Sequence, residues 1–122
     1  MTDETVRALA DRAQITDTLI RYAEGLDRHD LEAVRSCFAP EVSAEYGGVT
    51  IPPGVDALVE HISIVETFVS SMHLVGNVVI DLRGDDAHSS CRCVAYVLRD
   101  RGLTGEQERS GDVRLFMRGL TY

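Results

Sequence analysis

Apolar residues recur three or four positions apart over the first part of the chain. Between residues 5 and 26 this stripe consists of Val6, Leu9, Ala13, Ile15, Leu19, Tyr22, Ala23 and Leu26. The spacing places these side chains on one face of a helix, so it predicts a long amphipathic α-helix. Polar residues 27–30 end the pattern, and a second, short helix is predicted over residues 31–38, with Asp30 as its N-cap.

A second pattern, typical of strands, follows and is interrupted by one more helix. Residues 41–46 and 49–51 are predicted to be short strands joined by the tight turn Gly47-Gly48. Helical spacing returns over residues 55–69 and predicts a third helix. Residues 72–83, 87–99 and 112–122 are rich in β-branched and alternating residues and are predicted to be long strands.

The connections between these strands indicate an antiparallel sheet. Residues 84–86 form a short, turn-like connector, whereas the polar residues 100–111 are predicted to be a longer loop. Helices followed by antiparallel strands are typical of an α+β domain. We therefore expect one domain over residues 1–122, in which a curved antiparallel sheet wraps around the helices and leaves a pocket at its open end.

Composition narrows the possible functions of a chain of 122 residues. It has 20 acidic and 12 basic residues and a net charge of −8, which argues against nucleic acid and anionic membranes as partners. All the basic residues are arginine, which excludes a Schiff-base lysine and a phosphate-binding lysine. The sequence shows no secretory signal and no apolar run long enough to span a membrane, so we expect a cytoplasmic protein with reduced cysteines.

Four short runs of the sequence resemble SnoaL-like proteins of the nuclear-transport-factor-2-like superfamily. They are ITD at residues 15–17, RYAEGLDRHD at 21–30, CFAPEV at 37–42 and SMHLVGN at 71–77. Their order and separations match jointly over most of the chain. The resemblance implies a cystatin-like α+β roll, with a cone-shaped antiparallel sheet around three helices and an apolar pocket inside.

The branch of this family that contains scytalone dehydratase and the bile-acid dehydratase implies a set of site residues. Asp27 and His73 stand where that branch has an aspartate at the end of the first helix and a histidine opening the central strand. Tyr22 matches a tyrosine of the bile-acid enzyme, and Tyr46 matches a tyrosine of scytalone dehydratase. Leu26 stands where scytalone dehydratase has its own tyrosine. A second pocket histidine of that enzyme is replaced near Arg92, which leaves the substrate open.

The chemistry of these residue types is that of a dehydratase that needs no cofactor and no metal. Removal of water from a hydroxy carbonyl compound needs a base for the proton next to the carbonyl, an acid for the departing hydroxyl and a donor to the enolate oxygen. Asp27 can hold the ring of His73 in one tautomer, so that the ring accepts and returns a proton. The hydroxyls of Tyr22 and Tyr46 can donate to the enolate without bringing charge.

The pocket is expected to hold a small apolar molecule and to be lined by Leu26, Phe68, Asn77, Arg92 and Phe116. Alternation along residues 87–99 leaves open whether the face with Arg92 or the face with Cys91 and Cys93 points inward, and we favour the Arg92 face. Asn77 shares strand parity with His73, unless a bulge at Gly76 resets the register.

Other interpretations of the same residues stay open. Asp27 can be a turn former and His73 a histidine bonded to backbone. The same fold and dyad suit an isomerase or a polyketide cyclase, although the general base of ketosteroid isomerases would fall at Tyr46. A non-catalytic binding or dimerisation module would retain the pocket without the chemistry.

The end of the chain predicts association with a second copy. Relatives continue beyond the strand that ends here at Tyr122 with a turn and a last strand. Either the chain is a truncated product, or a partner chain covers the edge that the absent strand leaves exposed. We therefore expect a homodimer or a higher homo-oligomer.

Overall fold

The computed structural model describes the backbone of residues 1–100 and 105–118 and the side chains of residues 1–98. It confirms an α+β fold in which helices precede an antiparallel sheet. The elements are helix α1 Asp3–Asp27, helix α2 Leu31–Arg35, strand β1 Glu45–Tyr46, strand β2 Val49–Thr50, helix α3 Val55–Ile62, the 3-10 helix η1 Ser63–Thr67, strand β3 Phe68–Arg83, strand β4 Asp86–Asp100 and strand β5 Gly105–Arg118.

Helix α1 confirms the first predicted helix and extends it at its N-terminus. The Thr2 hydroxyl accepts a hydrogen bond from the backbone N–H of Thr5 at 3.1 Å, which caps the first turn. Asp3 and Glu4 lie in that turn, where negative charge complements the helix dipole. The buried side of the helix is the predicted stripe from Ile15 onward, whereas Val6 and Leu9 at its N-terminal end are exposed.

Helices α1 and α2 approach each other closely at Gly25. A Cβ atom at this position would lie 2.8 Å from Cγ2 of Val34, whose side chain is fully buried. Asp30 caps α2 by accepting the backbone N–H of Ala33 at 3.1 Å. The glycine therefore sets the distance between the end of α1 and α2, and so helps to place the C-terminal turn of α1.

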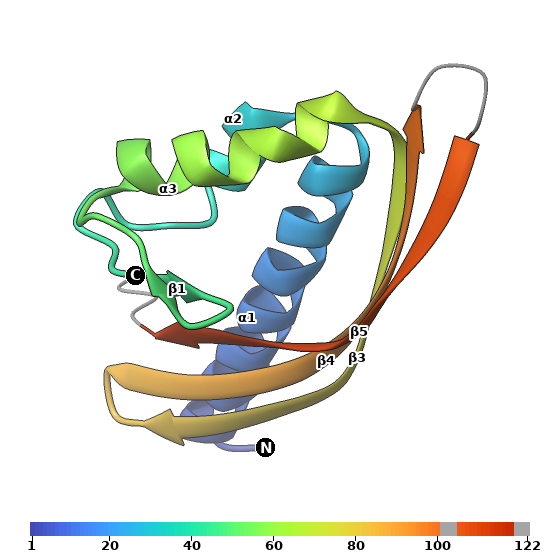
Figure 1. Cartoon of the computed structure of the whole chain (residues 1–122). Helices are drawn as coiled ribbons and strands as arrows, with labels where there is room; N and C mark the ends of the chain where they lie inside the picture. The colour runs from blue at the N-terminus through green and yellow to red at the C-terminus, as the bar shows by residue number, and fades with distance from the viewer. Residues whose placement is uncertain (101–104, 119–122) are drawn as a thin grey trace.

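Strands β3, β4 and β5 form one antiparallel sheet in that order. The sheet is strongly curved, and α1 lies across its concave side while α2 and α3 lie together near one end (Figure 1). Strands β1 and β2 form a separate two-stranded hairpin. Its turn consists of Gly47 and Gly48, whose φ angles of 55° and 82° are in the region that favours glycine.

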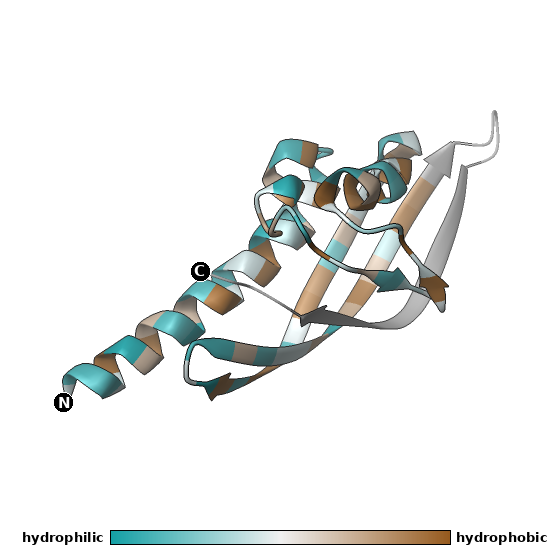
Figure 2. Ribbon diagram, turned by 90° about the vertical axis from the view of Figure 1, so that its left-hand side faces the viewer, coloured by the Kyte–Doolittle hydropathy of each residue, from teal (hydrophilic) through white to brown (hydrophobic). Residues whose placement is uncertain are grey.

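The two faces of the sheet differ in burial. Bands of different hydropathy alternate along its strands (Figure 2). On β3 the partly buried residues alternate with exposed ones from Ser71 to Val75. The pairing of β3 with β4 then shifts between Gly76 and Val79, and Asn77 adopts a positive φ of 50°. This bulge restarts the alternation, so that Val78 rather than Asn77 points inward.

Several predicted boundaries are wrong. The strand expected over residues 41–46 is limited to Glu45–Tyr46, and the third helix changes to the 3-10 helix η1 before the expected end at residue 69. Strand β5 begins at Gly105, inside the loop expected over residues 100–111. Hydrogen bonding to the long strand β4 outweighs the polar and glycine-rich composition of this segment. Residues 101–104 and 119–122 lie outside the described residues.

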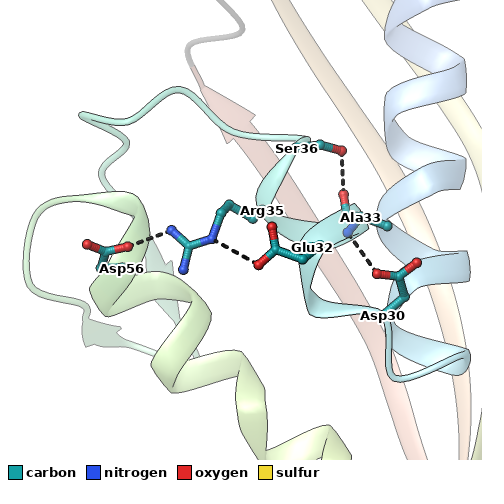
Figure 3. A network of polar contacts seen from close by, with 6 residues as sticks. All are labelled: Asp30, Glu32, Ala33, Arg35, Ser36 and Asp56. Atoms are coloured by element: carbon teal, nitrogen blue, oxygen red, sulfur yellow. Dashed lines mark hydrogen bonds and ion pairs between the residues drawn. The ribbon is translucent and has the colours of Figure 1, made fainter.

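The helices and the hairpin share an apolar core. It consists of Tyr22, Leu26, Val34, Cys37, Leu58, Ile62 and Val65. At the surface, Arg35 of α2 forms ion pairs with Glu32 and with Asp56 of α3 (Figure 3). Both carboxylates are about nine-tenths exposed, so each pair contributes at most about 1 kcal/mol, and only the pair with Asp56 joins the two helices. The buried core therefore provides most of the stability of this region.

Candidate active site

The structure brings Asp27 and His73 together from positions 46 residues apart. Asp27 is the last residue of α1, and His73 lies on the inward face of β3. Nδ1 of His73 lies 2.6 Å from Oδ1 of Asp27, and the side chains are 15% and 18% exposed. The bond engages Nδ1 and leaves Nε2 as the ring nitrogen that can reach a substrate.

The carboxylate of Asp27 is held by more than the imidazole. The backbone N–H of His73 donates to Oδ2 at 2.9 Å, and the hydroxyl of Ser71 donates to Oδ1 at 2.9 Å. Ser71 was not among the predicted site residues. Its position two residues before His73, on the same face of the strand, is the signal that could have indicated it. Asp27 thus links the end of α1 to β3 through hydrogen bonds to both of its carboxylate oxygens.

A second pair of candidate residues meets across the core. The hydroxyls of Tyr22 on α1 and Tyr46 on β1 lie 2.7 Å apart. Tyr22 is 3% exposed, and its ring meets that of Phe38 edge to face at 5.7 Å. Tyr46 is half-buried and its ring packs against that of His61 at 5.2 Å. Tyr22 is therefore the inner and Tyr46 the outer member of the pair.

Burial keeps both tyrosines neutral. Desolvation raises the pKa of Tyr22 well above its usual value of 10.0, and the neighbouring Tyr46 raises it further. Desolvation also raises the pKa of Tyr46, although the hydrogen bond from Tyr22 opposes this effect. Both hydroxyls therefore stay protonated, and because one of them donates to the other, one hydroxyl proton of the pair remains for a third group.

Cys93 interacts electrostatically with a member of each pair. It is buried on β4 opposite Val75, two residues beyond His73 on β3. Burial raises the pKa of its thiol, with further contributions from Cys91 and from the charge of Asp27, and the thiol in turn raises the pKa of Tyr22. Cys93 therefore lies within electrostatic range of both Asp27 and Tyr22. The raised pKa keeps the thiol protonated and neutral.

The expected pocket residues divide into three groups. Leu26 is buried in the apolar core, and Phe68 packs against that core from η1 and β3. The side chain of Phe116 lies outside the described residues. The inward placement of Arg92 is wrong, because Cys91, Cys93 and Ala95 form the buried face of β4 and Arg92 is exposed on the other.

Asn77 is also not a pocket residue. Because of the β-bulge, this exposed side chain does not lie on the inward face of β3 with that of His73. A regular strand would have placed both side chains on one face, so the bulge alone accounts for the difference.

A hollow of about 510 Å³ lies elsewhere, between α1 and the segment that follows α2. Its lining is mixed and includes Asp17, Arg21, Cys37 and Glu41, but none of the four candidate catalytic residues. Among the side chains that the structure describes, no three His, Cys, Asp or Glu residues gather as a metal ion would require. The Asp27–His73 pair and the tyrosine pair are therefore the chemistry-bearing groups that the fold assembles.

Fold and site together define a small α+β protein of an enzyme-like or ligand-binding kind. The chain belongs to the SnoaL-like domain family, whose model matches residues 7–122. No curated protein matches the sequence. Within the described part of the chain, no helix is long and apolar enough to cross a membrane.

Two bacterial proteins of known structure are similar to this chain. A candidate scytalone dehydratase from Novosphingobium aromaticivorans is 18% identical with a TM-score of 0.77, and the match covers 92% of this chain and 74% of that one. A variant of Rv3472, a protein of unknown function from Mycobacterium tuberculosis, is 22% identical with a TM-score of 0.76, over 90% of this chain and 66% of that one. At these identities the likeness establishes the nuclear-transport-factor-2-like fold alone.

A third solved structure is also that of a candidate dehydratase. A candidate dehydratase of the nuclear-transport-factor-2-like family from Streptomyces avermitilis is 17% identical with a TM-score of 0.66, over 82% of this chain and 79% of that one. None of these likenesses shows an activity of this chain.

Proposed function

We propose that this protein is a cofactor-independent dehydratase that acts on a small apolar β-hydroxy carbonyl compound. The observation that carries the proposal is the bond of 2.6 Å between Nδ1 of His73 and a carboxylate that is held at both oxygens. A general base must have one tautomer and a fixed direction, and this arrangement provides both. The reduced state expected of the buried cysteines favours a cytoplasmic location.

In the proposed reaction, Nε2 of His73 removes the proton from the carbon next to the substrate carbonyl. The electron pair moves toward the carbonyl oxygen, and the resulting enolate accepts a hydrogen bond from Tyr46, which Tyr22 supports from behind. The enolate then re-forms the carbonyl and expels the β-hydroxyl, which takes the proton back from Nε2 and leaves as water. The product is an α,β-unsaturated carbonyl compound and the enzyme is regenerated.

A chromogenic β-hydroxy ketone tests this reaction. The aldol adduct of acetone and benzaldehyde loses water to give the conjugated benzylideneacetone, which absorbs in the near ultraviolet, and hydroxylated polycyclic ketones extend the panel. We expect turnover by the natural chain and a fall in kcat of about 100-fold or more in His73→Ala and in Asp27→Asn. Glu24→Gln, an exposed carboxylate one turn earlier on α1, is the control and should retain full activity.

Unchanged turnover in both dyad variants would contradict the proposal. Binding of these ketones without any turnover would instead favour a non-catalytic binding module with the same fold. Direct measurement of binding by calorimetry, in parallel with the assay, separates these outcomes.

A further inference from the structure

We infer that Ser71 is a positioning residue that orients the Asp27 carboxylate and thereby fixes the ring of His73. Its hydroxyl donates to Oδ1 of Asp27 at 2.9 Å, the same oxygen that faces Nδ1 of His73 at 2.6 Å. The catalytic meaning of this role rests on the proposed function. The positioning itself is a property of the hydrogen bonds and can be measured without a substrate.

The geometry gives each carboxylate oxygen its own anchor. Oδ2 accepts the backbone N–H of His73 at 2.9 Å, and this contact alone would leave the carboxylate able to twist about its Cβ–Cγ bond. Ser71 holds the other oxygen, Oδ1, from the same strand two residues away. With both oxygens held, the direction in which Oδ1 meets the imidazole is fixed, and so is the plane of the ring.

The strand on which these groups lie explains why a side-chain donor is needed. Strand β3 is at the edge of the three-stranded sheet in the part of the chain that the structure describes, so its outer N–H groups have no strand beside them. The carboxylate at the end of α1 accepts one of these N–H groups, at His73. Ser71 adds a second donor from the inward face, because alternation puts its side chain beside that of His73.

The neighbouring serine provides a matched control. Ser70 is exposed, whereas Ser71 is half-buried. The substitutions Ser70→Ala and Ser71→Ala remove the same hydroxyl from adjacent positions of one strand. Only the second removes a bond to Asp27, so a general effect of losing a serine on β3 would appear in both variants.

The test is proton NMR of the histidine ring with ¹⁵N-labelled histidine. The natural chain should show a downfield Nδ1–H resonance that is absent from His73→Ala, and Ser70→Ala should retain it. In Ser71→Ala this proton should exchange with water about tenfold faster, so that its resonance broadens or disappears, because the carboxylate is no longer held. Ser71→Thr, which restores a hydroxyl, should restore the resonance.

Kinetics with the acetone–benzaldehyde aldol adduct give a second measure. We expect kcat to fall about tenfold in Ser71→Ala with KM changed by less than about twofold, since the serine acts through Asp27 and does not contact the substrate. Absence of the Nδ1–H resonance in the natural chain, or its unchanged width in Ser71→Ala, would overturn the inference. A resonance that responds as expected, in a protein that turns over no ketone, would support the positioning role and reject the proposed dehydratase.

Where Ser71→Ala does not fold, Ser71→Cys provides the same comparison with a weaker donor. A resonance intermediate in width between the natural chain and full loss is then expected. An unchanged resonance in Ser71→Cys would again overturn the inference.

Discussion

The hydrogen bond between Tyr22 and Tyr46 allows two hydroxyls to lie within an apolar core. Both rings pack against the cluster that contains Leu26 and Val34, where a hydroxyl without a partner would be costly. Each hydroxyl therefore supplies the hydrogen-bond partner that the other needs in the apolar core. The same bond leaves the outer hydroxyl oriented, which the proposed chemistry requires.

A double-mutant cycle should reveal this dependence. We expect Tyr22→Phe and Tyr46→Phe each to lower the free energy of unfolding by about 1–2 kcal/mol, because each leaves the other hydroxyl unsatisfied. The double variant should lose less than the sum of the two, since it buries no unpaired hydroxyl. Urea unfolding of the four proteins measures this coupling. Additivity of the two core variants would contradict the interpretation.

The site residues differ in how far the sequence could predict them. Asp27 and His73 could be predicted because they stand where the dehydratases that the sequence resembles have an aspartate and a histidine. An aspartate at a helix end or a histidine at a strand start is not specific by itself. Arg92 could not be placed, because alternation defines two faces of β4 without indicating which one the helices cover. Ser71 was missed because a serine in a strand carries no signal until its neighbour on the same face is known to bind a carboxylate.

At the scale of the elements, the close contact between α1 and α2 depends on a glycine inside a helix. Glycine is unfavourable there by about 1 kcal/mol relative to alanine, so its presence at position 25 requires a reason. The reason is the distance of 2.8 Å that a Cβ atom would have to Cγ2 of Val34. The backbone of Asp30 and Val34 is also within 3.3 Å of that position, so a rotamer change alone cannot relieve the contact.

Gly25→Ala should therefore destabilise the fold even though alanine favours a helix. We expect the free energy of unfolding to fall by about 1–3 kcal/mol, the usual cost of overpacking a buried contact. Thermal and urea unfolding measure the effect. Gly76→Ala, where a Cβ atom would meet nothing within 4 Å, is the matched control and should be nearly neutral. Equal stability of Gly25→Ala and the natural chain would show that α2 can move away without cost.

The elements themselves show which patterns suffice for prediction. The length of α1 and the pairing of β3 with β4 follow from apolar periodicity and a short connector, which are local signals. The start of β5 at Gly105 does not, because its residues pair with β4 through backbone hydrogen bonds that the side-chain pattern does not report. The bulge at Asn77 is similar: it reverses which side chains point inward, and only the pairing register defines it.

At the scale of the whole molecule, the part of the outer face of the sheet whose side chains the structure describes, on β3 and β4, is apolar although the chain is strongly acidic. Met72 pairs with Tyr96 and Leu74 with Val94, and these four side chains are between 41% and 55% exposed. The nearest charge on this face of β3 and β4 is Arg92, in a chain of net charge −8. Apolar faces of this kind mark interaction surfaces, and the scarcity of acidic groups here would let two copies meet without repulsion.

We therefore expect the protein to form a homodimer or a larger homo-oligomer through this face. Multi-angle light scattering at micromolar concentration should give a mass at least twice the 13.4 kDa of the chain. Leu74→Glu should shift the protein toward the monomer, because it places a charge among the apolar pairs. Ile64→Glu is the matched control, since Ile64 is exposed to almost the same degree, 56% against 55%, but lies on η1 away from the sheet.

The two glutamate variants also locate the contact. If both dissociate the oligomer, the effect is one of added negative charge and the outer face is not singled out. If neither does while the natural chain is oligomeric, the copies associate elsewhere, and the edge of the sheet becomes the stronger candidate. A monomer at all concentrations would contradict self-association. It would also leave the exposed pairs on β3 and β4 in need of a different partner.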